Sequence, residues 1–308
     1  MSKKLSIYIF KRFLMALLTI FFVIMITFFT MHAIPANPFN SEKAKSAAAI
    51  EAMQAKYGLD KPVIEQFFRY LGGVLRFDFG PSTSLVGNSV FDLIKSSAGY
   101  SARIGFTGAL IAIMTGIILG VVAALNRGRW PDKVIQLITN ALVSMPSFVM
   151  ATLLLLVFGL YIKWFPTIGT LPGGLVLPVV SLSLYPMAYI TRLERSSMLD
   201  VLGQDYIRTA RAKGLAINKV IFKHALKNAV SPVITYAGPM MAYILTGSMV
   251  VENIFSIPGL GRLFNNSMLK TDYMLIMGVT IFLAIIIVFM NFLCDMLNKI
   301  MDPRIDLG

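Results

Sequence analysis

Residues 104–125, IGFTGALIAIMTGIILGVVAAL, decide the fold of this 308-residue chain. They contain no charged side chain. A helix of about 20 apolar residues, rising 1.5 Å per residue, is long enough to cross the roughly 30 Å hydrocarbon core of a bilayer. The stretch therefore predicts a membrane-spanning helix.

Five further uncharged, apolar runs share this character: Phe13–Ala33, Val134–Ile162, Leu175–Thr191, Ala229–Val251 and Met274–Leu293. The run at 175–191 is the shortest and carries Pro178 and Pro186, which need support from neighbouring helices in a membrane. We predict an all-α integral membrane protein with about six transmembrane helices.

The composition agrees with this prediction. The chain is 56% hydrophobic and 14% charged, whereas soluble domains average about 45–50% apolar and about 25% charged residues. One cysteine, Cys294, and two histidines, His32 and His224, are too few for a disulfide or a Cys/His metal site. The sequence also has no Gly-Lys dipeptide, H-E-x-x-H or G-x-S-x-G. We predict no catalytic, cofactor or metal site in this chain.

The basic residues indicate the topology. The chain carries 28 Lys and Arg against 15 Asp and Glu, a net charge of +13. The Lys and Arg residues gather before the first run, at 127–133, at 192–227 and after the last run. The positive-inside rule places such segments in the cytoplasm. Both termini are then cytoplasmic, and residues 35–102 lie outside. The excess charge reflects topology and gives no support for a nucleic-acid partner.

The extracytoplasmic segment contains two sets of apolar residues at helical spacing: Ala47, Ile50, Met53 and Tyr57, then Ile64, Phe67, Phe68, Leu71 and Leu75. The spacing predicts two amphipathic helices. They would serve either as a tether on the bilayer surface or as a docking platform for an outside partner.

The six runs contain no Asp, Glu, Lys or Arg. Proton-coupled carriers commonly bury such residues in their spans, so their absence argues against that class. Sodium sites built from backbone and hydroxyl oxygens would leave no such trace. Small residues such as Gly116 and Gly120 predict close helix packing. Ser144 and Ser147 could line a pathway or form ordinary interhelical hydrogen bonds.

The most informative loop follows the fourth run, at residues 205–214, DYIRTARAKG. Asp205 is a candidate N-cap, Gly214 can adopt the left-handed conformation that ends a helix, and Asn218 can cap a second helix. We predict a helix, a glycine turn and a second helix with a basic stripe at Lys219, Lys223 and Lys227. Such a loop either faces lipid head groups or inserts into a cytoplasmic subunit.

Residues 205–214, followed by HALKNA at 224–229 and by Pro232, resemble the conserved cytoplasmic loop of binding-protein-dependent ABC importer permeases. Other matching stretches are FDFGPS at 77–82, AAL at 123–125, Arg192 with RSSM at 195–198, TGSMVVE at 246–252, IPGLG at 257–261 and MDPR at 301–304. Together they resemble the B-type subunit of the peptide and nickel permease family. TARA at 209–212 replaces the general Glu-Ala-Ala start, as is usual in the peptide branch.

The resemblance implies a permease subunit for oligopeptide import in the bacterial cytoplasmic membrane. It implies a second homologous permease, two cytoplasmic ATPases that bind ATP and Mg²⁺, and an external lipoprotein receptor as partners. The domains would be an anchor at 1–34, an extracytoplasmic segment at 35–102, and a core at 103–308 with a coupling loop at 194–228. The residues that engage the ATPase would be Asp205, Tyr206, Arg208, Thr209, Ala210, Arg211, Ala212, Lys213 and Gly214.

Two alternatives stay open. Dipeptide and nickel permeases of the same family share these motifs, and a carrier driven by an ion gradient would also be a polytopic membrane protein. The pathway-lining side chains are not assigned.

Overall fold

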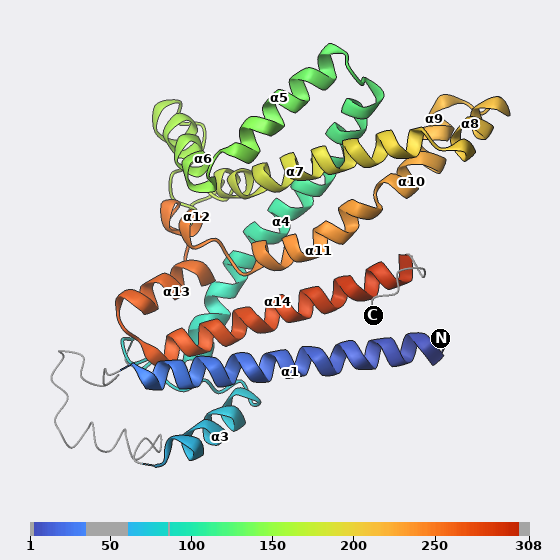
Figure 1. The fold of residues 1–308 in the computed structure, drawn as a ribbon. Coiled ribbons are helices and arrows are strands. Elements are labelled where there is room, and N and C mark those ends of the chain that lie inside the picture. Colours follow the sequence, from blue (N-terminus) through green and yellow to red (C-terminus); the bar gives the residue numbers. More distant parts are fainter. Residues whose placement is uncertain (1–2, 35–60, 86, 302–308) are drawn as a thin grey trace. The chain divides into compact units, whose positions relative to one another are not determined.

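The computed structural model describes residues 3–34, 61–85 and 87–301, and within these ranges the chain is helical and contains no β-strand (Figure 1). Five helical segments are long and apolar enough to cross a membrane, and a sixth is present if one bent pair of helices counts as a single span. The five are Ser6–Ala33, Val90–Leu125, Val176–Leu202, Ser231–Ile254 and Tyr273–Met296. The prediction of an all-α membrane protein with about six spans is confirmed.

Unit 1 consists of the described residues of Met1–Ser101 and Pro258–Phe292. Its helices are α1 (Lys3–Ala33), α3 (Val63–Val74), the first part of α4 (Val90–Leu125), α13 (Leu260–Leu269) and the first part of α14 (Tyr273–Met301). Side chains from all five helices meet in one buried core that includes Phe28, Phe67 and Met277. Unit 1 is therefore assembled from two segments far apart in the sequence.

Helix α3 confirms the second predicted amphipathic helix, and it begins directly after Pro62. Proline suits a helix start because it has no backbone N–H to leave unpaired. Phe67 is buried, whereas Ile64 and Phe68 are exposed, so the apolar residues cover more than one face. The other predicted helix, over 47–57, lies outside the described residues.

A buried carboxylate, Asp272, connects the 82–84 loop of unit 1 to the start of α14. It accepts hydrogen bonds from the hydroxyl groups of Ser82 and Ser84 and from the backbone N–H groups of Thr83 and Ser84. It also accepts a bond from the N–H of Leu275 in the first turn of α14. Burial raises the pKa of Asp272, but these hydrogen bonds outweigh it and hold the pKa below its usual value. The ionised side chain thus fixes the 82–84 loop to the start of α14.

Unit 2 consists of the described residues of Ala102–Ile257 and Leu293–Gly308. It contains the rest of α4 and α14 together with α5 (Trp130–Ser144), α6 (Ser147–Leu154), the π-helix η1 (Leu155–Tyr161), α7 (Val176–Leu202), α11 (Ser231–Leu245) and α12 (Met249–Ile254). Helix α7 packs against α5, α6 and α11 and is the centre of the unit.

The predicted run at 134–162 is not one straight helix. It is divided between α5 and α6–η1, which are bent by 106°. The break falls at Met145, whose backbone is extended, and Pro146. Proline disfavours the helical conformation of the residue before it and cannot donate to the preceding turn, which explains the bend.

The glycines of α4 lie where other helices approach. A Cβ atom added to Gly116 would lie 2.7 Å from the side chain of Ile190, and one on Gly120 would lie 2.6 Å from Glu194. Both partners are on α7. The predicted packing role of these two glycines is confirmed, because only a residue without a side chain lets the helices come this close.

Candidate functional site

The first half of the predicted loop folds as helix α8 (Asp205–Ala212). The expectation that Asp205 caps it is wrong: the N-cap residue is Gln204, and Asp205 is the first helical residue. A carboxylate in the first turn still interacts favourably with the helix dipole. Gly214 has a φ of +74° and reverses the chain as predicted. No atom lies within 4 Å of the position that a Gly214 Cβ would take, so its backbone angle alone requires glycine.

The second half consists of α9 (Ile217–Lys219), the π-helix η2 (Val220–Ala225) and α10 (Leu226–Ala229). Asn218 does not cap it, because Ala216 is the N-cap residue and Asn218 lies inside the first turn. The two predicted faces are present. Val220, Ile221, Ala225 and Ala229 are buried, and Lys219, Lys223 and Lys227 are exposed.

The loop has its own core. Ile207 and Ala210 of α8 are buried in one cluster with Met198 of α7 and with Val220 and Ile221 of η2. The end of α4 contributes Val121 and Ala124 to the same cluster. A force applied to α8 therefore reaches two spanning helices through close-packed side chains.

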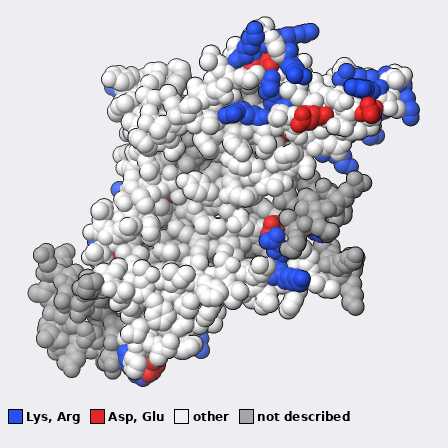
Figure 2. Space-filling model, in the orientation of Figure 1, with Lys and Arg blue, Asp and Glu red and all other residues white. Residues whose placement is uncertain are grey.

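A hydrogen bond joins the two halves at the surface. The amide of Asn228 in α10 donates to the hydroxyl of Tyr206 in α8 over 2.8 Å. Ile207 faces the core, whereas Arg208, Arg211 and Lys213 are exposed. In unit 2, Lys and Arg gather over α8 and α9 and over the start of α5 (Figure 2). The loop thus presents a basic, folded projection.

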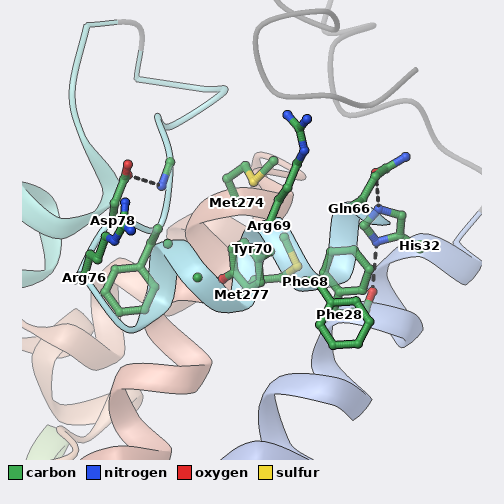
Figure 3. Close-up of a pocket in the computed structure, with 14 residues that line it drawn as sticks. Phe28, His32, Gln66, Phe68, Arg69, Tyr70, Arg76, Asp78, Met274 and Met277 are labelled. Carbon is green, nitrogen blue, oxygen red and sulfur yellow. Dashed lines mark hydrogen bonds between the residues drawn. The ribbon is translucent and has the colours of Figure 1, made fainter. Parts of the chain in front are cut away.

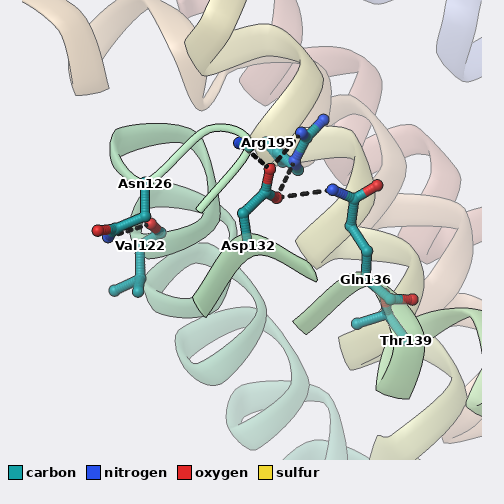
Figure 4. Close-up of polar contacts among 7 residues, drawn as sticks. Val122, Asn126, Asp132, Gln136, Thr139 and Arg195 are labelled. Atoms are coloured by element: carbon teal, nitrogen blue, oxygen red, sulfur yellow. Dashed lines mark hydrogen bonds and ion pairs between the residues drawn. The ribbon is translucent and has the colours of Figure 1, made fainter. Parts of the chain in front are cut away.

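The other basic loop of unit 2 is tied to α7 by an ion pair between a buried carboxylate and a partly buried guanidinium (Figure 4). Arg195 of α7 binds Asp132 of α5 with two hydrogen bonds, Nε to Oδ1 at 2.7 Å and Nη2 to Oδ2 at 2.8 Å. The carboxylate also accepts bonds from the N–H of Gly128 and the amide of Gln136. Asp132 is 1% exposed. Because all its donors lie on different turns or elements, it fixes the α4–α5 connection to the helix that leads into α8.

A cavity of about 700 Å³ lies at the break between α5 and α6. Tyr185, Tyr236 and Tyr243 line it, and Tyr243 is 80% exposed. Four serines and three prolines also line it, and of the prolines only Pro146 lies at the helix break, because Pro186 and Pro239 lie inside α7 and α11. The complete set of other lining residues is Ser144, Ser147, Ser181, Ser248, Pro146, Pro186, Pro239, Val143, Met145, Leu182, Met240, Ile244 and Gly247. The lining contains no charged side chain.

Comparison with known proteins assigns the family. The model of the binding-protein-dependent transport system inner membrane component matches residues 116–307, and the model of its N-terminal part matches residues 5–84. The chain belongs to this permease family. The prediction made from its motifs is confirmed.

Curated relatives of this permease are similar over nearly their full length. The Bacillus subtilis dipeptide transport system permease protein DppB is 44% identical over 97% of this chain and 98% of its own. The oligopeptide transport system permease proteins OppB of Haemophilus influenzae and Escherichia coli are 42% and 40% identical over the same shares.

Solved structures share the fold. The membrane-transporter structure described as inward-facing conformations of the MetNI methionine ABC transporter aligns with a TM-score of 0.58 and 17% identity, covering 68% of the permease and 96% of that chain. An amino acid ABC transporter solved with histidines gives a TM-score of 0.51 and 16% identity, covering 70% and 94%. At these identities the likeness concerns the fold alone.

The permease brings together the loop residues named from the sequence and adds two features that the sequence did not indicate. Asp132 and Arg195 are 63 positions apart, and no periodicity connects them. The tyrosines of the cavity come from two helices, and only Ser144 and Ser147 among the lining residues were pathway candidates. A charged residue close to the end of an apolar run, as Asp132 is, was the available signal.

Proposed function

We propose that this permease is the B-type subunit of an ATP-driven importer of oligopeptides. The supporting observation is the folded projection at 205–229, anchored by a buried core to α4 and α7, in a chain similar over its whole length to peptide permeases. A self-sufficient carrier has no evident use for such a projection.

The proposed mechanism places α8 and the Gly214 turn in a socket on a cytoplasmic ATPase, which binds ATP and Mg²⁺. Movement of the ATPase then shifts α7, because Ile207 and Ala210 share a core with Met198. The Asp132–Arg195 pair makes α5 follow α7. A second homologous permease completes the pathway, and an external lipoprotein delivers the substrate.

The cavity beside Pro146 is the proposed contact with the passing peptide. Hydroxyl groups and aromatic faces bind peptide backbone and varied side chains without selecting one charge, as a broad peptide permease requires. Ser144 and Ser147 belong to this lining. Selectivity then rests mainly with the receptor.

Uptake in a strain lacking this chain tests the substrate. We expect uptake of labelled oligopeptides to fall to background and nickel uptake to persist, because the cavity lining offers no fixed charge or metal ligand set. Restoring the gene serves as the control for the uptake measurement. In a second experiment, the chain is purified gently from its native membrane, and two ATPases and a second permease should be purified with it. Normal peptide uptake with lost nickel uptake would move the assignment to the metal branch, and purification without ATPases would favour a carrier.

The proposed topology is testable with single cysteines. Cys294, the only cysteine of the sequence, is replaced by serine, and Lys95→Cys and Lys213→Cys are introduced at two exposed lysines. In intact cells stripped of their wall, an impermeant thiol reagent should label position 95 and spare position 213, because the basic loops face the cytoplasm. The opposite labelling would show that the topology is inverted.

A further inference from the structure

Unit 1 contains a pocket of about 420 Å³ between α1, α3 and the start of α14 (Figure 3). Phe28, Met274 and Met277 give it apolar walls, and Arg69, Arg76 and Asp78 add charges. The proposed peptide pathway does not include this pocket, which is formed by residues of unit 1 only.

The polar groups of the pocket carry an excess of donors. The His32 ring stacks on Phe28, and its Nδ1 and Nε2 lie 3.0 and 3.1 Å from the Phe28 carbonyl oxygen and Gln66 Oε1. Gln66 Nε2 donates to the carbonyl of Lys61, which orients Oε1 toward the histidine. Both ring nitrogens thus lie against oxygen atoms, which fixes the ring at the wall of the pocket.

One further donor has no partner. The Tyr70 hydroxyl is buried and makes no hydrogen bond in the described part of the chain, and Tyr70 lines the pocket. A buried hydroxyl without a partner costs free energy comparable to a lost hydrogen bond. The lining carries two arginines, Arg69 and Arg76, and one carboxylate, Asp78, which accepts a bond from the N–H of Gly80; Arg69 also pairs with Glu65, which lies outside the lining. The lining is therefore complementary to an anion.

The depth of the pocket follows from α1. The ring of Phe67 in α3 contacts the rings of Phe21, Phe28 and Phe29 at centroid distances of 6.2, 5.5 and 5.5 Å. At 1.5 Å per residue, these α1 positions lie about 6–18 Å short of the helix end at Ala33. Since α1 spans the membrane, α3 lies within one leaflet of the bilayer, and the polar pocket lies at the head-group level.

The exposed surface of α3 agrees with this position. Ile64 is 57% exposed, Phe68 is 61% exposed, and Leu75, just after the helix, is 76% exposed. Lys61, Glu65 and Arg69 form an ion-pair series on the same segment, with distances of 2.7 and 3.3 Å. Apolar side chains beside a charged edge are typical of a helix in the membrane interface.

We propose that this pocket binds the head group of an anionic phospholipid from the adjoining leaflet. Arg69 and Arg76 are the donors to its phosphate oxygens. Its acyl chains follow the exposed side chains of α3, beginning at Phe68. Under the proposed topology this is the outer leaflet, so α3 is a lipid-anchored element of the permease.

Native mass spectrometry of the complete chain, purified with its accompanying subunits and exchanged with phosphatidylglycerol or phosphatidylcholine, tests the proposal. We expect preferential retention of phosphatidylglycerol. In Arg69→Ala/Arg76→Ala its affinity should fall roughly 30-fold, since each basic residue at an anionic surface contributes roughly fivefold. Tyr70→Phe should leave retention unchanged, because the Tyr70 hydroxyl is buried and not exposed to the pocket.

A variant that fills the pocket with a side chain gives an independent test of lipid binding. A Cβ on Gly72, which lines the pocket, would meet no atom within 4 Å, so Gly72→Leu begins in open space and is expected to reduce lipid retention while keeping both arginines; its thermal unfolding in detergent checks that the fold is retained. Lys61→Ala is the matched control, because Lys61 does not line the pocket and should leave retention unchanged.

Three outcomes would overturn the proposal. One is that the wild-type protein retains phosphatidylglycerol and phosphatidylcholine equally, and that the double arginine variant retains them as well as the wild type does. Another is loss of receptor binding in these variants with lipid retention intact, which would make the pocket a protein contact. Displacement of the lipid by millimolar inorganic phosphate or by peptide would likewise show a simple anion site.

Discussion

We expect the replacement of Gly214 by valine or aspartate to abolish peptide uptake while the protein remains inserted in the membrane. The φ of +74° lies in the left-handed region, where a side chain costs about 1–2 kcal/mol and a β-branched one more. Because a Cβ there meets no neighbouring atom within the permease, the spanning helices should be unaffected. The damage is confined to the turn presented to the ATPase, so uptake should fall to background although the spanning helices remain folded.

ATP turnover and peptide uptake, measured in parallel on the reconstituted transporter, separate coupling from folding. In these variants, ATP hydrolysis should no longer respond to the loaded receptor. Gly214→Asn is the matched control for Gly214→Asp, since both residues tolerate left-handed geometry; activity kept by the asparagine variant and lost by the aspartate variant would come from the added charge at the turn. Lys223→Ala, which removes one exposed charge of the basic stripe, should change uptake little. Full transport by Gly214→Asp at normal expression would show that the loop is only a lipid-facing connector.

Replacing Asp132 by alanine should destabilise the permease by about 2 kcal/mol, because Arg195, which is partly buried, loses its charge-assisted hydrogen bonds. Arg195 would lose both of its carboxylate bonds, and Gly128 and Gln136 would each lose an acceptor. The transition measured by thermal unfolding in detergent should shift markedly downward. Transport should fall as well, because α5 no longer moves with α7.

A double variant distinguishes the ion pair from simple packing. Asp132→Leu/Arg195→Met removes both charges and should recover much of the stability lost in Asp132→Ala, since a buried pair can often be replaced by apolar groups. Glu65→Ala is a control, because its ion pairs with Lys61 and Arg69 are exposed and should contribute little to stability. An Asp132→Ala protein as stable as the wild type would show that the pair has no structural role.

The spanning helices could be predicted because bilayer thickness imposes a length that an apolar run must match. Helix α3 and the two faces of the second loop helix followed from residue spacing for a similar reason: burial repeats with the period of the helix. The run at 134–162 showed the limit of this method. Its hydropathy is continuous across Met145 and Pro146, whereas the backbone turns by 106° there.

The capping predictions failed because local propensity is weak beside tertiary packing. Asp205 and Asn218 are both suitable caps, yet each lies one or two residues inside its helix. The start is determined by the burial of Ile207 and Val220 in the loop core. Two features depend on how the helices pack against each other. One is the pairing of Asp132 with Arg195. The other is the carboxylate of Glu194, which is buried without a hydrogen bond in the described part of the chain. No single-sequence pattern reports that.

Asp272 has a consequence for the order of synthesis. Its partners Ser82 and Ser84 leave the ribosome 190 and 188 residues earlier, and at about 5–20 residues per second the interval is roughly 10–40 s. During that time the 82–84 loop has no carboxylate to bind, and the core of unit 1 lacks the side chains of α13 and α14. The N-terminal third of the permease therefore cannot complete its folding until residues 102–257 of unit 2 have been synthesised. A nascent chain truncated before residue 272 should be a ready substrate for membrane proteases.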